Sequence, residues 1–557
     1  MFPLRRRLTG ICLGAITGLL WAFPLLAAEK LFFSYGPLML SLRVESLSAF
    51  AQTGAVDPDL AFYLNRVSPE QQQAFRAALT RPLAIDPVWA SRFFNSAMGQ
   101  EILVGLGKGI TIPGGSNGAY ALRAAIVQGA FEPGGLTVLK VLENLPTDMQ
   151  VQGEVAAGFA QKLQDLVLAT ETLVQELRRL TAQEAALAPQ VNYEQLPDLR
   201  QSGPYGVKKT VWKLVDRSRN RAFYVDVFQP QNPPEGELPV IVFSHGLTSR
   251  PEDYAVNLEH LAAYGYVVAA PQHPGSDKIY LEEMLAGYHR NIFDEQEFIN
   301  RPLDLKFVLD EVERRNPGEF QGRLNLRQVG VAGHSFGGYT ALAVAGAEID
   351  FENLERDCQR PYSGIDISLL LECRALALPR QRYSFRDPRI QAVFAANPVN
   401  RSIFGPKGLE PIQVPVLLAS GSDDPAAPPA LEQITSFLWL TPPDKYWMLL
   451  EGQAHVNFTE LDASLTHTLN ATLHLVLPSQ NLIYDYVKGA SIAFFETYIR
   501  ADPQSPDRYR AYLNPAYAEY LSAGQTFKLD MVTAKSAPAL RQLVDNFRAE
   551  HGGLLSE

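Results

Sequence analysis

The segment 333–337, Gly-His-Ser-Phe-Gly, has the residue types and spacing of a nucleophilic serine on a sharp turn. It follows the apolar run 329–332 and precedes small and helix-forming residues, so we expect a strand, a tight turn and a helix there. Glycine on each side lets two backbone segments approach with no Cβ atom between them. Ser335 would then hold its hydroxyl outside the sheet, within reach of a base and of a substrate carbonyl.

A second segment, 114–118 (Gly-Gly-Ser-Asn-Gly), fits the same pattern around Ser116. It follows Pro113 and a run that is poor in strand-forming residues, which indicates a flexible glycine loop. A nucleophile also needs an oxyanion loop before it, and an acid and a histidine after it, in that chain order. Because this context can be traced around Ser335, we expect Ser335 and not Ser116 to be the nucleophile.

The run 240–243, Val-Ile-Val-Phe, predicts a strand that is buried on both faces. It ends in Ser-His-Gly-Leu at 244–247, a turn in which backbone N–H groups can face a pocket. We expect the amides of Leu247 and Phe336 to form an oxyanion hole for the negative oxygen of an attacked carbonyl, with about 3–4 kcal/mol from each donor. The alternative is an ordinary turn between a strand and a helix that contains a glycine.

Two later core strands, 414–419 and 445–450, are predicted to lead into an acid and a base. After the first strand, the spacing of Asp424 from the neighbouring glycine and proline fits the acid, with Asp423 as the fallback and a solvated acidic turn as the alternative. After the second strand, His455 completes the order serine, aspartate, histidine. The predicted catalytic residues are therefore Ser335, Asp424 and His455.

The chain has nine histidines, so most of them must serve other purposes. His245, His273 and His334 are expected near the pocket, but on loops that do not suit a general base. The remaining five are predicted to be surface or packing residues: His260, His289, His467, His474 and His551.

At these motifs the stretch from about 208 to 500 resembles the platelet-activating-factor acetylhydrolase-like and predicted dienelactone hydrolase branch of the α/β-hydrolases. The motifs are Phe-Ser-His-Gly-Leu at 243–247, Val-Val-Ala-Ala-Pro-Gln-His-Pro-Gly-Ser at 267–276, Arg-Pro-Leu-Asp at 301–304 and Gly-His-Ser-Phe-Gly-Gly at 333–338. The resemblance implies the α/β-hydrolase fold and ester hydrolysis. The segment from Leu31 to about 150 resembles a small helical domain of unknown function that precedes such hydrolases in bacterial proteins.

Two departures from that branch concern the chemistry. The acetylhydrolases carry their acid after the strand that follows the elbow helix, but here the strand 390–396 is followed by Asn397. Asparagine has no charge with which to orient a histidine, so the acid is assigned to Asp424 on the next strand. Dienelactone hydrolases use a cysteine nucleophile, whereas Ser335 occupies that position here.

Composition sets the broad class of the protein. The 557 residues are 46% hydrophobic and 20% charged, which is typical of a globular protein of more than one domain. The net charge of −11 argues against a nucleic-acid partner, which would need a basic face, but leaves lipid binding open. The sequence contains no metal-ligand cluster, and the expected chemistry needs no cofactor.

The first 28 residues predict export. Arg5-Arg6-Arg7 is a positive start, residues 8–26 are largely apolar, and Ala27-Ala28 offers small residues for cleavage. An uncleaved membrane anchor, with association of the protein with a membrane through this segment, is the alternative. Removal of the leader would leave Cys358 and Cys373, which we expect to form a disulfide worth about 3 kcal/mol, with two free thiols as the alternative.

Four regions are predicted along the chain. They are a signal peptide or anchor (1–28), an all-helical domain with an amphipathic helix (29–190), a mostly parallel, doubly wound α/β-hydrolase domain (205–500) and a C-terminal tail (501–557). Strands 210–215 and 223–228 should form an antiparallel hairpin at the start of the sheet. Two apolar insertions, 278–300 and 347–387, would either shape an acyl pocket or simply pack down.

The sequence thus predicts an exported serine carboxylic-ester hydrolase that acts on lipid or small acyl esters through an acyl-enzyme. A thioesterase or peptidase could use the same three residues. A binding protein on an inactive hydrolase fold is the alternative from a different class. The oligomeric state and the role of the N-terminal domain do not follow from the sequence.

Overall fold

The computed structural model describes residues 27–83, 85–233, 235–360, 366–455, 477–500 and 508–551. The predicted leader up to residue 26, together with His467 and His474, lies outside the described residues. The chain forms two compact units, one of the residues up to 94 with 99–158 and the other of 95–98 with the residues from 159 onward. Among the described residues, no helix combines the length and the apolar character needed to span a membrane.

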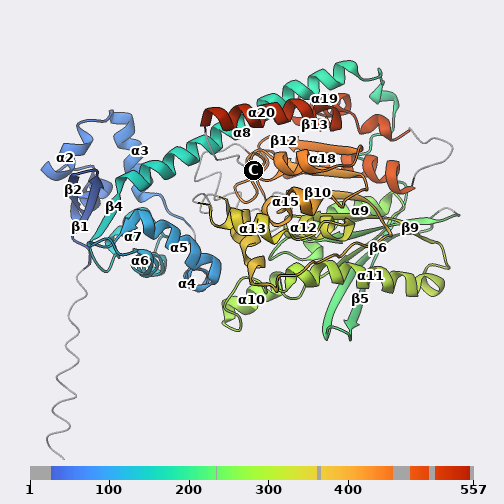
Figure 1. Ribbon diagram of the computed structural model, residues 1–557, viewed down its shortest axis with the longest axis horizontal. Coiled ribbons are helices and arrows are strands. Elements are labelled where there is room, and N and C mark those ends of the chain that lie inside the picture. The colour runs from blue at the N-terminus through green and yellow to red at the C-terminus, as the bar shows by residue number, and fades with distance from the viewer. Residues whose placement is uncertain are drawn as a thin grey trace, which may run out of the picture. The chain divides into compact units, whose positions relative to one another are not determined.

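The larger unit is built on a nine-stranded sheet, and the prediction of a mostly parallel sheet is confirmed (Figure 1). Its order is β13-β12-β11-β10-β9-β7-β8-β6-β5, with parallel pairing from β8 through β12 and antiparallel pairing at both ends. The strands are β5 (Val207–Asp216), β6 (Arg221–Pro230), β7 (Leu238–Ser244), β8 (Val267–Pro271), β9 (Leu324–His334), β10 (Ile390–Ala396), β11 (Val416–Gly421), β12 (Lys445–Leu450) and β13 (Leu529–Thr533).

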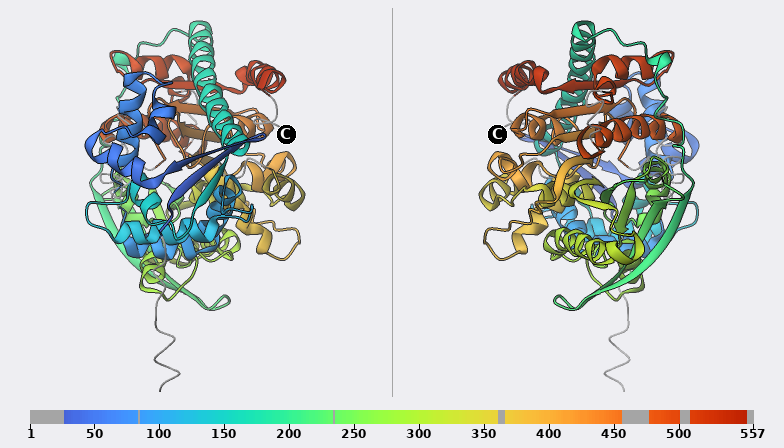
Figure 2. Two further views of the ribbon diagram at one scale, coloured as in Figure 1. Left: turned by 90° about the vertical axis from the view of Figure 1, so that its left-hand side faces the viewer. Right: turned by 90° about the vertical axis from the view of Figure 1, so that its right-hand side faces the viewer.

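Burial of the strands follows their sequence patterns. Every residue of β7, β8, β11 and β12 is buried, as expected for continuous apolar runs in the centre of a sheet. The outer strand β5 alternates between exposed and buried positions over its second half, which is typical of an edge strand with one face in solvent. The β5–β6 hairpin curls away from the rest of the sheet (Figure 2).

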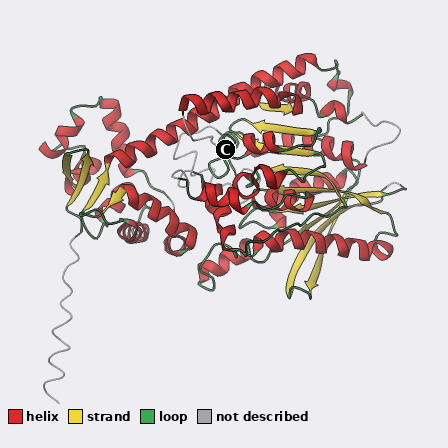
Figure 3. Ribbon diagram, viewed as in Figure 1, coloured by secondary structure: helices red, strands yellow, loops and turns green. Residues whose placement is uncertain are grey.

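Helices cover the sheet on both faces (Figure 3). Two of them, α9 (Ala255–Ala263) and α18 (Gln480–Phe495), share one apolar core with a face of the central strands. The others are α11 (Glu297–Glu319), α12 (Phe336–Ala345), α15 (Arg401–Leu409) and α16 (Gln433–Trp439). Because the central strands are parallel, the loops after β7, β9, β11 and β12 leave the sheet at the same edge.

The segment after residue 500, expected to be a tail, continues the fold. Helix α19 (Pro515–Ser522) leads to β13, which pairs with β12, and α20 (Ala537–His551) follows. Buried Leu529, Met531 and Val532 give β13 its place at the sheet edge. Pairing with a strand about eighty positions away leaves no local signal, so the sequence pattern did not show it.

The smaller unit contains the helices α1 (Val44–Thr53), α2 (Pro58–Leu64), α3 (Pro69–Thr80), α4 (Pro87–Asn95), α5 (Ala97–Gly109), α6 (Ala119–Phe131) and α7 (Val138–Glu143), of which α4 and α5 also reach into residues 95–98. Helix α3 begins with a capping box, which Ser68 and Gln71 form.

The expectation of an entirely helical domain is corrected by a four-stranded sheet in this unit. Its order is β2-β1-β4-β3, with β1 (Lys30–Tyr35), β2 (Leu38–Arg43), β3 (Ile110–Thr111) and β4 (Met149–Gln152). The strands are short, and β1 finds its parallel partner β4 more than a hundred positions later. The two-residue turn at Gly36-Pro37 was the one local signal for the β1–β2 hairpin.

The amphipathic helix α8 (Gly153–Leu187) crosses the boundary between the units at residue 158. Its residues from 159 onward belong to the larger unit, where Leu173, Leu177 and Leu180 are buried. The Thr181 hydroxyl donates a hydrogen bond of 3.0 Å to the carbonyl of Met531 in β13. The structure therefore divides the chain at 158, whereas the sequence analysis placed the end of the first domain at 190.

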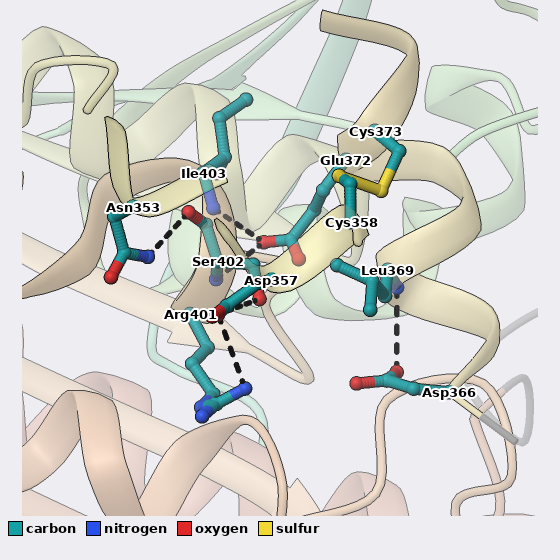
Figure 4. Close-up of a disulfide and its surroundings, with 10 residues drawn as sticks. All are labelled: Asn353, Asp357, Cys358, Asp366, Leu369, Glu372, Cys373, Arg401, Ser402 and Ile403. Atoms are coloured by element: carbon teal, nitrogen blue, oxygen red, sulfur yellow. Dashed lines mark hydrogen bonds and ion pairs between the residues drawn. A yellow bond between two sulfur atoms is a disulfide. The ribbon is translucent and has the colours of Figure 1, made fainter. Parts of the chain in front are cut away.

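The two predicted insertions are mostly helical. The first contains α10 (Lys278–Ala286), and the second contains α13 (Phe351–Cys358), α14 (Ile367–Glu372) and the 3-10 helix η3 (Cys373–Ala377). Their apolar side chains largely pack inward, since Met284, Phe293 and the three leucines 369–371 are buried. The predicted Cys358–Cys373 disulfide is confirmed, with 5.8 Å between the Cα atoms (Figure 4).

Candidate active site

Ser335 lies on the tight turn between β9 and α12. It has φ 57° and ψ −120°, a conformation that non-glycine residues adopt at a cost and that is concentrated at functional sites. The flanking glycines are required, because a Cβ on Gly333 would lie 2.0 Å from the Gly337 carbonyl oxygen and one on Gly337 would lie 1.9 Å from the Ser244 carbonyl oxygen. The turn predicted from the sequence is therefore the turn that forms.

His455 links Ser335 to Asp424. Its Nε2 lies 2.8 Å from the Ser335 hydroxyl oxygen, and its Nδ1 lies 2.7 Å from Asp424 Oδ2. A carboxylate can only accept, so Nδ1 carries the proton and Nε2 is free to accept from the serine. Asp423, the fallback acid, is exposed and accepts a hydrogen bond from Ser422 instead.

Asp424 is buried, yet its environment favours the charged form. Its Oδ1 accepts from the amides of Ala426 and Ala427, both at 2.8 Å, and its Oδ2 accepts from Asn397 Nδ2 at 2.6 Å. Burial raises the pKa of Asp424, but the nearby imidazole and these donors outweigh it, so the pKa lies below its ordinary value. A carboxylate is thus available to stabilise a protonated imidazole.

The loop after β7 lies against the serine. A Cβ on Gly246 would be 3.5 Å from the Ser335 Cβ, which places the 245–247 backbone beside the nucleophile. The amides of Leu247 and Phe336 follow directly on these two residues in the chain. In the part of the chain that the structure describes, neither amide donates to a protein acceptor. The role of these two amides as oxyanion donors stays a prediction.

A chain of hydrogen bonds joins this loop to the histidine. The Gly246 amide donates to the Tyr254 hydroxyl at 3.1 Å, and that hydroxyl lies 2.9 Å from His334 Nδ1. His334 Nε2 lies 2.8 Å from the His455 carbonyl oxygen, so Nε2 must donate and Nδ1 must accept from Tyr254. Burial and the neighbouring His455 ring lower the pKa of His334 to about 3, which keeps this ring neutral.

The sequence predicted Ser335, Asp424 and His455, but it did not predict the residues that hold them in place. Asn397 was noted only as a residue that cannot act as the acid, whereas it donates to the acid and accepts from Gln453 Nε2 at 3.2 Å. Tyr254 was not predicted to be a site residue, and His334 was expected near the pocket but was given no role. The second glycine motif forms a loop in the smaller unit, where Ser116 is exposed.

Within the described ranges, each histidine other than His455 has a structural partner. His273 Nδ1 lies 2.9 Å from Asp304 Oδ2, and His260 Nε2 lies 2.9 Å from the Leu199 carbonyl oxygen. Among the described residues, no group of His, Cys, Asp and Glu is arranged to hold a metal ion.

The sheet, the serine turn after β9 and the acid and histidine after later strands define an α/β-hydrolase. Family models match in two places. Residues 27–152 match the family described as alpha/beta hydrolase of unknown function (DUF1400), and residues 198–356 match the chlorophyllase family. No curated protein matches the chain.

The chlorophyllase match includes Leu247, Ser335 and Phe336 and ends before Asp424 and His455. The assignment of the acid and the histidine therefore rests on chain order and geometry, and not on a family match. Both families belong to the α/β-hydrolases, and the matches support a hydrolase. The acetylhydrolase-like branch that the motifs suggested stays a prediction.

Proposed function

We propose that the protein is an exported serine carboxylic-ester hydrolase for lipid or small acyl esters. The observation that carries the proposal is the continuous contact from Ser335 through His455 to a charged Asp424. These contacts give the serine a base, and they give the base a carboxylate that stabilises its protonated form.

In the acylation step, His455 Nε2 takes the proton as the Ser335 oxygen attacks the ester carbonyl. The C=O bond becomes a C–O⁻ bond in the tetrahedral intermediate, and the amides of Leu247 and Phe336 bind that oxygen. Collapse of the intermediate breaks the bond to the alcohol, which receives the proton from His455. An acyl-enzyme remains.

In the second step, a water molecule attacks the acyl-enzyme while His455 takes its proton. The bond to Ser335 then breaks, the serine recovers its proton from the imidazole, and the free acid leaves. Asp424 keeps its charge throughout and orients the ring through Nδ1. Besides the ester, the reaction consumes only water, and it needs no cofactor.

Two observations support export. The N-terminal sequence has the order of a signal peptide, and Cys358–Cys373 is a disulfide of the kind that persists outside the reducing cytosol. The proposal leaves the preferred acyl group unassigned, because the apolar side chains of both insertions mostly pack inward. The chlorophyllase match adds chlorophyll to the esters that should be compared.

The test compares Ser335→Ala with Ser116→Ala in the purified mature protein. We expect Ser335→Ala to lose p-nitrophenyl ester turnover by a factor of about 10⁴ or more, and Ser116→Ala to keep it. Near-normal turnover by Ser335→Ala would contradict the proposal.

The substrate is identified by a panel on the wild-type protein. It contains p-nitrophenyl esters of increasing chain length, a phospholipid, chlorophyll, a thioester and a peptide amide. We expect the oxygen esters to be turned over fastest. A preference for the thioester or the amide would assign the same three residues to a thioesterase or a peptidase.

A further inference from the structure

Arg301 is a buried cation beside the candidate oxyanion loop. It belongs to the Arg-Pro-Leu-Asp motif at 301–304 and lies in the first turns of α11. Its side chain is fully buried, and burial lowers its pKa to about 10, so it remains charged at neutral pH. A buried guanidinium needs partners for its donors, and their identity shows what it does.

The donors of Arg301 are directed at backbone oxygens of the loop after β7. One terminal nitrogen, Nη1, donates to the His245 carbonyl at 2.6 Å, and the other, Nη2, donates to the Gly246 carbonyl at 3.3 Å. Its Nε donates to the Ser276 hydroxyl at 2.8 Å. No carboxylate in the described part of the chain forms an ion pair with Arg301.

A neighbouring arginine shows the contrast. Arg221 is partnered by carboxylates, with 2.8 Å contacts to both Glu297 and Asp304. The same two acids lie near Arg301 and raise its pKa, but they do not take its donors. The positive charge of Arg301 is therefore left to act on the two carbonyl groups.

The Gly246 carbonyl belongs to the same peptide group as the Leu247 amide. In a trans peptide the C=O and the N–H point in opposite directions, so fixing the oxygen fixes the direction of the amide. His245 Nδ1 holds that carbonyl oxygen from a second side at 2.7 Å. Donors on the oxygen also polarise the peptide, which strengthens the amide as a donor.

Arg301 reaches the second amide residue as well. Its guanidinium lies over the Phe336 ring, 4.4 Å from the centroid. One cation thus contacts the carbonyl of the peptide group that carries the Leu247 amide and the side chain of Phe336.

We propose that Arg301 is a positioning residue that orients and polarises the Leu247 amide for the developing oxyanion. This inference rests on the proposed function. It gives the 301–304 motif a role in stabilising the transition state, in addition to packing α11 against the sheet.

The test is Arg301→Gln, with turnover of p-nitrophenyl acetate expressed per active site titrated by a fluorophosphonate probe. We expect kcat per site to fall by about tenfold to a hundredfold, with KM changed by less than about twofold. Inhibition by a trifluoromethyl ketone, whose adduct carries an oxyanion, should weaken by the same factor as kcat/KM.

Arg315→Gln is the matched control. Arg315 lies on the same helix, also over an aromatic ring, 4.4 Å from the Trp212 centroid, but far along α11 from the 301–304 motif. We expect it to lower stability and to leave kcat per titrated site unchanged. Arg301→Lys keeps a cation, but with a single donor nitrogen, so it should recover part of the loss and serves if the glutamine variant does not fold.

The outcomes separate the two proposals. If Arg301→Gln keeps kcat per site and inhibitor affinity while Ser335→Ala is inactive, or if Arg301→Lys does so where the glutamine variant does not fold, the proposed role of Arg301 is wrong and the function stands. If Ser335→Ala is active, the proposed function falls and the role of Arg301 falls with it.

Discussion

Two groups of buried and partly buried charges lie beside loops of the candidate site and hold them in opposite ways. The arginine cluster consists of Arg219, Arg221, Glu297, Arg301 and Asp304, and the acid cluster consists of Asp357, Asp366, Glu372 and Glu432. The first presents donors to backbone carbonyls at 245 and 246. The second presents acceptors to backbone amides at the start of α15.

The acid cluster caps a helix. Glu432 Oε2 accepts from the amides of Asn400 and Arg401, both at 3.0 Å, and Glu372 Oε1 accepts from those of Ser402 and Ile403, both at 3.2 Å (Figure 4). The first amides of a helix have no partners within the helix and attract negative charge. Two carboxylates thus satisfy four backbone donors.

The difference between the clusters lies in how their charge responds to pH. In the arginine cluster, burial raises the pKa of Glu297 and Asp304, but Arg301, which holds the loop, keeps its charge at neutral pH. In the acid cluster, burial and the charge of Asp366 raise the pKa of Glu432 to about 7, and burial and neighbouring acids raise that of Glu372 well above its ordinary value. The backbone at 245–246 is therefore held by a constant charge, and the start of α15 is held by charges that titrate.

Removal of the disulfide should affect the acid cluster most. Cys358 and Cys373 directly follow Asp357 and Glu372, so the bond keeps the two acids together. We expect the double variant Cys358→Ser, Cys373→Ser to lose about 3 kcal/mol in the free energy of unfolding, measured by urea denaturation. A loss below about 1 kcal/mol would contradict this, and wild type with reductant provides the matched comparison.

The pH dependence of stability should be carried partly by Glu432. In the unfolded chain this group loses its proton near pH 4.5, whereas the folded protein keeps it until about pH 7. Stability should therefore be greatest below that window and fall as the pH rises through it, by up to about 3 kcal/mol.

Melting curves between pH 5 and 8 check this expectation. Glu432→Gln should flatten the fall, while the exposed Glu237→Gln should not. Equal slopes for wild type and Glu432→Gln would show that Glu432 does not titrate in this range.

A smaller effect is expected for Asn397, whose side chain donates to the proposed catalytic acid Asp424. Asn397→Ala removes the donor to Asp424 Oδ2 and should lower kcat about tenfold, the worth of one charge-assisted hydrogen bond. Gln391→Ala is the control, because its amide lies at the other end of β10 and donates to the Pro388 carbonyl. Equal kcat values in the two variants would show that Asn397 does not contribute to the site.

The smallest effect is expected for a charge pair outside both clusters. Arg327 and Glu237 form an ion pair at 2.9 Å, but their side chains are 79% and 57% exposed. Solvent screens such a pair, so Arg327→Gln should change the free energy of unfolding by less than about 0.5 kcal/mol. A larger change would weaken the distinction between buried and exposed charge on which the comparison depends.

The sequence was sufficient for features that local pattern or chain order encodes. Apolar runs predict buried strands. The chain order serine, aspartate, histidine identified Ser335, Asp424 and His455 among many polar residues. The contacts that hold them join distant positions, such as Tyr254 with His334, 80 residues apart, and Arg301 with His245, 56 residues apart. No spacing rule links such pairs before the fold brings them together.

The same reason explains the missed strands. The edge strand β13 and the small sheet at β1–β4 are short and pair across long stretches of chain, so propensity alone was too weak a signal. An amphipathic helix was predicted where α8 forms, but an apolar helix face does not show which unit it packs against.

The central claim is that Ser335 is made nucleophilic by His455 in a site prepared for negative charge. The most direct measurement is to label the purified wild-type protein with a fluorophosphonate and to map the adduct by peptide mass spectrometry. The account predicts one adduct, on the peptide that contains Ser335, and no adduct in a His455→Ala variant. A protein that is not labelled, or that is labelled at another serine such as Ser116, would contradict it.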